Sequence, residues 1–121
     1  MATRKTHKVR GATFESDLRD YARALGYDAE RLARAGSKDE GDVSIRAVGL
    51  HGTAIVEAKA PGADGKIDLP GWLREAKVEA QNYGDARGID VGDLIPMVVI
   101  KARGKSIEEA YVVMRWGDVF K

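Results

Sequence analysis

The stretch Thr53-Ala54-Ile55-Val56-Glu57-Ala58-Lys59 decides the fold, because it is mostly apolar and carries its two charged residues at its end. A short run of this kind predicts a strand in the interior of a sheet. Alternation along a strand places Glu57 and Lys59 on one face and Ala58 on the other. Charges at the end of a buried strand are costly unless they are paired or bound to a metal. The stretch therefore predicts either a divalent-cation site beside a phosphodiester or a structural ion pair.

A second predicted strand, residues 42–48, alternates apolar and polar side chains. The turn at residues 49–52 joins both strands as an antiparallel hairpin, which brings Asp42 back to the end of the first stretch. In the simplest register Asp42 faces Lys59 and Ser44 faces Glu57. The same register pairs Val43 with Ala58, Ile45 with Val56 and Ala47 with Ala54. One face is then apolar and the other carries the candidate site, where an ion pair of Asp42 with Lys59 is the structural alternative.

The remaining elements complete an α/β pattern. Phe14, Leu18, Ala22 and Leu25 recur at helical spacing, and Gly26 is a natural stop. The predicted elements are a helix over 12–25, a short strand within 27–34, a helix over 72–83 and strands over 94–101 and 110–116. Pro96 places the start of the third long strand at an edge or a bulge. The order predicts a mixed sheet flanked by helices.

The composition is that of one ordinary globular domain of 121 residues, which we divide into a basic arm (residues 1–10) and a single domain (residues 11–121). The formal net charge is +1, so nucleic-acid binding cannot be argued from the total. A basic arm is as typical of a phosphate contact as of a solubilising terminus. The arm residues that could bind DNA are Arg4, Lys5, Lys8 and Arg10. The absence of cysteine and of a long apolar run fits a cytoplasmic protein without a membrane partner.

Further candidate residues lie outside the hairpin. Glu15 borders the apolar stripe of the first predicted helix and could reach a metal, although an acid in a first helical turn is also favoured by the helix dipole. Ser37 and Lys38 precede Asp42 and could touch a phosphate, although such loop residues more often form turns. Gln81 is a weaker candidate near the apolar stripe of the second helix. We expect Trp72, Tyr83 and Trp116 in the core rather than stacked on bases.

Several short motifs occur together in order: Gly11-Ala12-Thr13-Phe14-Glu15 with Leu18, Gly26-Tyr27, Ala35-Gly36-Ser37, Gly41-Asp42 and Glu57-Ala58-Lys59. With them the chain resembles the PD-(D/E)xK nuclease superfamily over roughly residues 11–81. More closely, it is similar to the small archaeal-type Holliday-junction resolvases and their phage-encoded relatives. Gly41 stands where the superfamily pattern has proline, which leaves Asp39 and Glu40 as rivals to Asp42.

This resemblance implies a restriction-endonuclease-like fold and a Mg²⁺-dependent endonuclease that resolves four-way DNA junctions as a homodimer, in the host cytoplasm if phage-encoded. It implies that Asp42, Glu57 and the Ala58 carbonyl ligate Mg²⁺, for which Mn²⁺ can substitute, with Glu15 as a direct or water-mediated ligand. Lys59 would then orient the attacking water or neutralise developing charge. The alternatives are a restriction-like or repair nuclease on duplex or branched DNA and a non-catalytic nucleic-acid-binding module.

Overall fold

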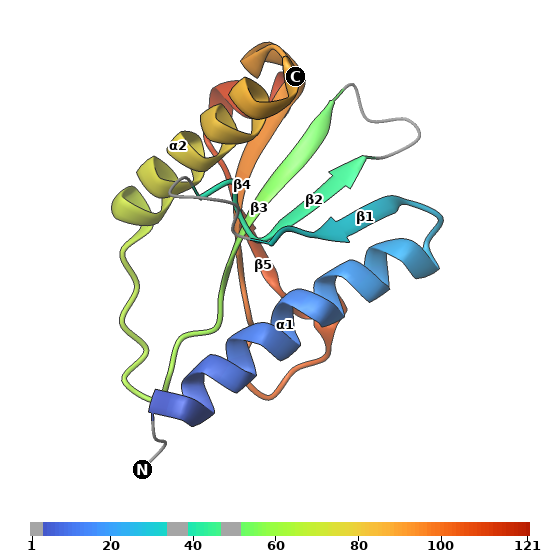
Figure 1. Cartoon of the computed structure of the whole chain (residues 1–121). Helices are drawn as coiled ribbons and strands as arrows, with labels where there is room; N and C mark the ends of the chain where they lie inside the picture. Colours follow the sequence, from blue (N-terminus) through green and yellow to red (C-terminus); the bar gives the residue numbers. More distant parts are fainter. Residues whose placement is uncertain (1–3, 34–38, 47–51) are drawn as a thin grey trace.

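In the computed structural model, two helices lie on opposite faces of a five-stranded sheet (Figure 1). The structure describes residues 4–33, 39–46 and 52–121, and the side chains of the first helix from residue 13 onward. The main elements are α1 (Arg4–Ala24), β1 (Asp28–Arg31), β2 (Val43–Arg46), β3 (Thr53–Lys59), α2 (Leu69–Arg87), β4 (Leu94–Ile100) and β5 (Tyr111–Val113). Three short 3-10 helices, η1 (Val91–Asp93), η2 (Ile107–Glu109) and η3 (Trp116–Phe120), follow α2, β4 and β5.

The sheet is mixed, as the sequence predicts. Its strands follow the order β1-β2-β3-β4-β5, and β3 is central. The pair β3–β4 is parallel and is connected through α2, whereas the other pairs are antiparallel. Pro96 pairs with Ile55 on the β3 side, and β5 covers β4 only from Val98 to Ile100. The missing amide of Pro96 therefore falls where β5 does not reach, which confirms the expected edge position.

The register of the hairpin differs from the predicted one by two residues. Val43 pairs with Val56, and Ile45 pairs with Ala54. One residue before this ladder, Asp42 comes opposite Glu57 rather than Lys59. Because the shift is even, every side chain keeps the face assigned from the sequence. The register prediction was wrong, but the separation of faces was right; the pairing predicted for Ala47 lies outside the described residues.

The two faces of the sheet pack against different helices, which explains why β3 is buried on both sides. On one face Phe14 of α1 packs with Val43, Val56 and Val99. The opposite face meets α2 in two clusters: Ile55, Ala80, Tyr83 and Leu94, and beside them Ala76, Val98 and Ile100. Glu57 and Lys59 share the face of Ile55, so their side chains emerge under α2.

Helix boundaries extend beyond the predicted ones. Helix α1 begins at Arg4, so residues 4–10 continue the helix ahead of its predicted start at residue 12. Helix α2 starts after Asp68, whose carboxylate accepts a hydrogen bond from the Gly71 amide, and ends at Gly88 with φ of +66°. Within the described part of the chain, no helix is long and apolar enough to cross a membrane.

The aromatic residues divide between core and surface. Tyr83 is buried against the sheet, and Trp72 packs at the edge of the core, as expected. Trp116 was expected in the core, but 76% of its surface is exposed, and its ring meets Phe120 edge-on with 4.9 Å between the centroids. The prediction for Trp116 was wrong because β5 ends at Val113 and the chain turns into η3 instead of continuing as a strand.

Candidate active site

Glu57 and Lys59 lie side by side at the end of β3, as strand alternation predicts. The Nζ atom of Lys59 is 3.4 Å from Glu57 Oε1 and 3.0 Å from Glu75 Oε2 on α2. It also lies 5.4 Å from the centroid of the Trp72 ring. Burial alone would lower the pKa of Lys59, but the hydrogen bond and charge of Glu75 and the charge of Glu57 raise it on balance. Lys59 is therefore a charged ammonium held between two carboxylates.

Asp42 is fixed to β3 by two main-chain contacts. Its amide donates to the Val56 carbonyl over 2.9 Å, and its Oδ2 accepts from the Ala58 amide over 2.8 Å. In a strand the amide and carbonyl of one residue point to the same side, so the Ala58 carbonyl also faces Asp42. Burial raises the pKa of Asp42, although the Ala58 hydrogen bond opposes the shift. A carboxylate and a carbonyl thus converge beside Glu57.

Glu15 approaches this group from the α1 side of the sheet. Its Oε2 accepts a hydrogen bond of 2.9 Å from Nη2 of Arg31, and its carboxyl group also contacts that of Asp42. Burial and the neighbouring Asp42 raise the pKa of Glu15 to about 6, although Arg31 opposes the shift. The structure therefore brings Glu15 to Asp42, so that it joins the cluster at its edge.

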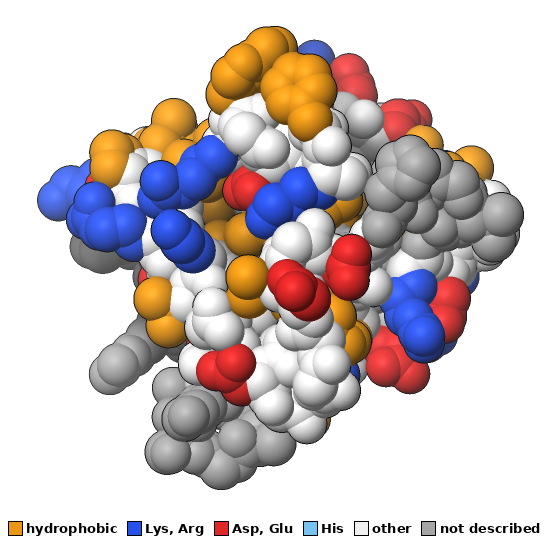
Figure 2. Space-filling model, turned by 90° about the horizontal axis from the view of Figure 1, so that it is seen from above, with side chains coloured by type: hydrophobic (Ala, Val, Ile, Leu, Met, Phe, Trp, Pro, Cys, Tyr) orange, Lys and Arg blue, Asp and Glu red, His pale blue; other side chains and the backbone are white. Residues whose placement is uncertain are grey.

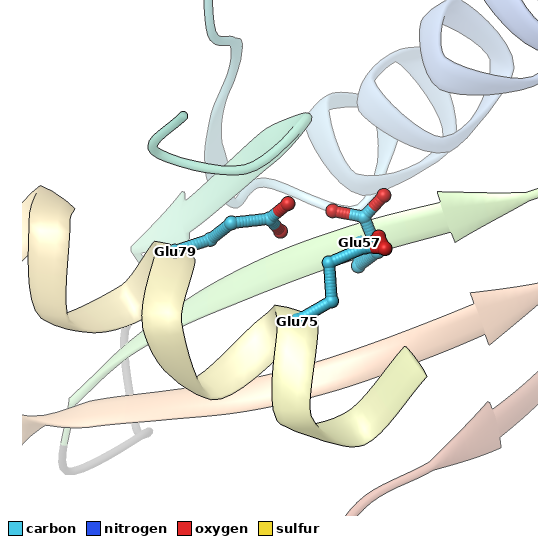
Figure 3. A group of neighbouring side chains, drawn as sticks. All are labelled: Glu57, Glu75 and Glu79. Atoms are coloured by element: carbon cyan, nitrogen blue, oxygen red, sulfur yellow. The ribbon is translucent and has the colours of Figure 1, made fainter. Parts of the chain in front are cut away.

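Two glutamates of α2 complete the cluster and were not predicted from the sequence. Figure 3 shows Glu75 and Glu79 projecting from α2 toward Glu57 on β3. One carboxylate oxygen from each of the three residues lies within 4.8 Å of the others. The spacing contained a signal, because Glu79 falls three residues after Ala76 and four before Tyr83, on the buried stripe of the helix.

Two carboxylates at the centre of the cluster have a buried oxygen that no proton donor or cation contacts among the described residues. Glu57 Oε2 and Glu79 Oε2 are buried and have no hydrogen-bond partner among the described residues. Burial and the charge of Asp42 raise the pKa of Glu57 to about 7, although the Glu79 hydrogen bond and Lys59 oppose the shift. Burial, reinforced by Glu57, raises the pKa of Glu79 to about 10. Such oxygens must be protonated or coordinated, and an all-oxygen donor set fits a hard divalent cation.

Other predicted candidates do not join the cluster. Gln81 is exposed and donates to Asp85 over 2.9 Å, so the structure does not bring it to the cluster. Glu40 is paired with Arg87. Asp39 accepts a hydrogen bond from the Gly41 amide and borders the cluster, where its charge helps to raise the pKa of Asp42 and of Glu79. Asp42, rather than either rival, is the acid that contacts the Ala58 amide. The remaining DNA-binding candidates cannot be placed: Ser37 and Lys38 lie outside the described residues, as do the side chains of Arg4, Lys5, Lys8 and Arg10.

The departure at Gly41 has a structural reason. Its φ is +97°, a value that proline cannot adopt, and a Cβ there would lie 2.9 Å from Cγ2 of Ile55. We expect Gly41→Ala to lower the free energy of unfolding by about 1–2 kcal/mol from backbone strain, with a further loss from crowding. Urea denaturation checks this. Gly65→Ala is the matched control, because Gly65 has φ of +62° but open space around it. An equal loss of the free energy of unfolding in both variants would show that crowding against Ile55 does not contribute.

The raised carboxyl pKa values predict a pH dependence of stability in the absence of divalent cations. With a chelator present, the folded protein holds protons on Glu79 and Glu57 that the unfolded chain releases above its ordinary glutamate pKa of 4.5. Stability should therefore be greatest at low pH and fall as the pH rises through about 7 toward about 10. Glu79→Gln should reduce this slope by up to about 1.4 kcal/mol per pH unit.

Urea titrations between pH 5.5 and 8.5 in chelator measure the slope. Asp85→Asn, an exposed acid of the same helix, is the control that should leave the slope unchanged. An unchanged slope in Glu79→Gln would show that Glu79 is not the group that holds the proton.

Comparison with known proteins identifies the fold that carries this cluster of carboxylates. No protein-family model matches the chain, and no curated protein matches it. Among solved structures, Hjc of Archaeoglobus fulgidus, a Holliday junction resolvase from an archaeal hyperthermophile, is similar with a TM-score of 0.51 and 15% sequence identity. The alignment covers 84% of this chain and 73% of the Hjc chain. The fold is restriction-endonuclease-like.

Charged side chains are unevenly distributed over the surface. On the face seen from above, Lys and Arg gather most densely on one side, while acidic side chains lie toward the middle and the other side (Figure 2). The net charge of +1 thus conceals a separation of charge. A polyanion such as DNA would be attracted to the basic side of this face rather than to the molecule as a whole.

Proposed function

We propose that this chain is a metal-dependent endodeoxyribonuclease that resolves four-way DNA junctions. The observation that carries the proposal is the convergence of Asp42 and Glu57 beside Lys59, with a buried Glu57 oxygen that has no hydrogen-bond partner among the described residues. Glu57 and Lys59 at the end of β3, with Asp42 held against this strand from just before β2, supply two carboxylates and an amine that suit hydrolysis of a phosphodiester beside a divalent cation. Similarity of fold to Hjc supports the nuclease class.

Each side chain has a distinct role in this proposal. Asp42, Glu57 and the Ala58 carbonyl would hold Mg²⁺, or Mn²⁺ as a substitute, and Glu15 would be a direct or water-mediated ligand through its contact with Asp42. When bound, the cation polarises the phosphate and lowers the pKa of a coordinated water. Lys59 would neutralise the negative charge that develops on the phosphate oxygens.

Branched DNA is the substrate that we favour. The support is that Hjc is a Holliday junction resolvase and that the structural alignment covers most of both chains.

A four-way junction needs paired cuts in two strands related by a two-fold axis, so we propose a homodimer. Its interface would include the exposed apolar side chains of β5 and η3, which are Tyr111, Val112, Trp116, Val119 and Phe120. Light scattering should give the mass of a dimer for the wild type and of a monomer for Trp116→Ser.

The function is tested with a synthetic four-way junction whose strands are end-labelled. We expect paired, symmetric cuts in Mg²⁺ or Mn²⁺ and no cuts in chelator. A linear duplex of the same sequence is the control substrate. Equal cutting of duplex and junction would favour a restriction-like or repair nuclease. Junction binding with no cleavage in either metal would instead indicate a non-catalytic nucleic-acid-binding module and overturn the proposal.

A further inference from the structure

Glu79 is the most deeply buried carboxylate of the cluster, and the proposed catalytic cation site leaves it unexplained. Its residue is only 4% exposed, and although its carboxyl group contacts that of Glu57, its Oε2 has no hydrogen-bond partner among the described residues. No ion pair of Glu79 with a described cation exists, whereas Glu57 and Glu75 both contact Lys59. The carboxyl group nevertheless points from α2 toward the sheet, into the space that Glu57 and Glu75 border (Figure 3).

The geometry of these three glutamates fits a cation. One oxygen from each lies within 4.8 Å of the other two. Oxygen ligands at about 2.0–2.6 Å from a divalent cation lie at most about 4–5 Å from one another. The three carboxylates therefore need little movement to coordinate one ion, and the helix spacing of four residues between Glu75 and Glu79 holds two of them on one side of it.

The balance of charge also leaves room for a second cation. Six carboxylates, those of Glu15, Asp39, Asp42, Glu57, Glu75 and Glu79, lie close enough to act on one another's charge. Their positive partners among the described residues are Arg31 and Lys59. With all of these groups ionised, one divalent cation would leave the cluster negative. A second one would balance the remaining charge and so remove the repulsion that the negative phosphate of a DNA strand would otherwise meet.

We propose that Glu57, Glu75 and Glu79 hold a second divalent cation, which shares Glu57 with the cation at Asp42 and Ala58. Only the position of the first cation rests on the proposed function. The second cation would take over the carboxylate of Glu75 that now holds Lys59 at 3.0 Å. Filling this position would thereby release the ammonium group toward a bound phosphate, and it would couple the orientation of Lys59 to the cation concentration.

The test counts Mn²⁺ ions bound to the full chain by calorimetry and by electron paramagnetic resonance, without DNA. We expect two ions for the wild type, one for Glu79→Gln, one for Asp42→Asn and two for the exposed control Asp85→Asn. Glu75→Gln should weaken one binding event by at least about 10- to 100-fold. Because Glu75 is more exposed than Glu79, this variant provides the test if Glu79→Gln fails to fold. A wild type that binds one ion, or a Glu79→Gln or Glu75→Gln variant that binds like the wild type, would overturn the inference.

The outcomes separate this inference from the proposed function. Two bound ions without cleavage of any DNA would leave the second site standing and remove the nuclease assignment. If the protein binds one ion and cleaves the junction, and if cleavage is lost in Asp42→Asn but kept in Glu79→Gln, the nuclease assignment would stand and the second site would be excluded.

Discussion

Asp42→Asn is expected to reduce the rate of junction cleavage by at least about 10²–10³-fold, the loss typical when one group that stabilises developing charge is removed. The asparagine oxygen can still accept the hydrogen bond from the Ala58 amide, so the hairpin should keep its geometry. What is lost is the negative charge that would hold the cation beside Glu57. Single-turnover cleavage in Mg²⁺ measures the effect, and junction binding should remain near the wild-type affinity.

Asp85→Asn is the matched control for Asp42→Asn. It makes the same chemical change at an exposed position on α2, where Asp85 contacts only Gln81 among the hydrogen bonds of the described residues. Cleavage by this variant should equal that of the wild type. A wild-type rate in Asp42→Asn, with the control unaffected, would exclude Asp42 from the proposed reaction.

Phe14→Ala is expected to produce the largest loss of stability. The ring is 2% exposed and packs against Val43, Val56 and Val99, so it attaches α1 to three strands of the sheet. Truncation of a buried phenylalanine to alanine costs about 3–5 kcal/mol, which is a large part of the total stability of a domain this size. The next residue along the helix is Glu15, so loosening α1 should also weaken its contact with Asp42.

Urea denaturation of Phe14→Ala and of Leu25→Ala compares the loss of a buried apolar side chain with the loss of an exposed one. Leu25 follows the same helix but is 59% exposed, and its removal should change the free energy of unfolding only slightly. Similar losses in the two variants would contradict the packing of α1 on the sheet through Phe14.

The central strand and the pairing of its charged residues could be predicted from local pattern alone. A run of apolar residues between Thr53 and Lys59 predicts β3 with the bounds that the structure shows. Its period of two residues places Glu57 and Lys59 together regardless of the rest of the fold. The alternation in β2 likewise predicts which side chains face α1.

The register of the β2–β3 hairpin could not be predicted, because it depends on the turn that joins the strands. The observed register preserves both faces while it moves Asp42 from Lys59 to Glu57. The hydrophobic pattern is identical in both registers and cannot distinguish them. The correction matters for the proposed chemistry, since it places the two acids rather than an acid and an amine opposite each other.

Glu75 and Glu79 were missed for a different reason. Acids on a helix usually face solvent, and only the rotation of α2 over the sheet decides which of them are covered. The sequence placed Gln81 near the site, but α2 turns the side of Glu75 and Glu79 toward β3 and leaves Gln81 in solvent. Tertiary packing therefore determined the acidic half of the cluster, whereas local pattern determined the half on β3.

Anomalous diffraction from crystals soaked in Mn²⁺ tests the central claim most directly. We predict a peak at about 2.0–2.6 Å, the range for oxygen ligands of divalent cations, from carboxylate oxygens of Asp42 and Glu57 and from the Ala58 carbonyl. No such peak beside Asp42 and Glu57 at saturating Mn²⁺ would contradict the claim that these residues form a cation-dependent active site.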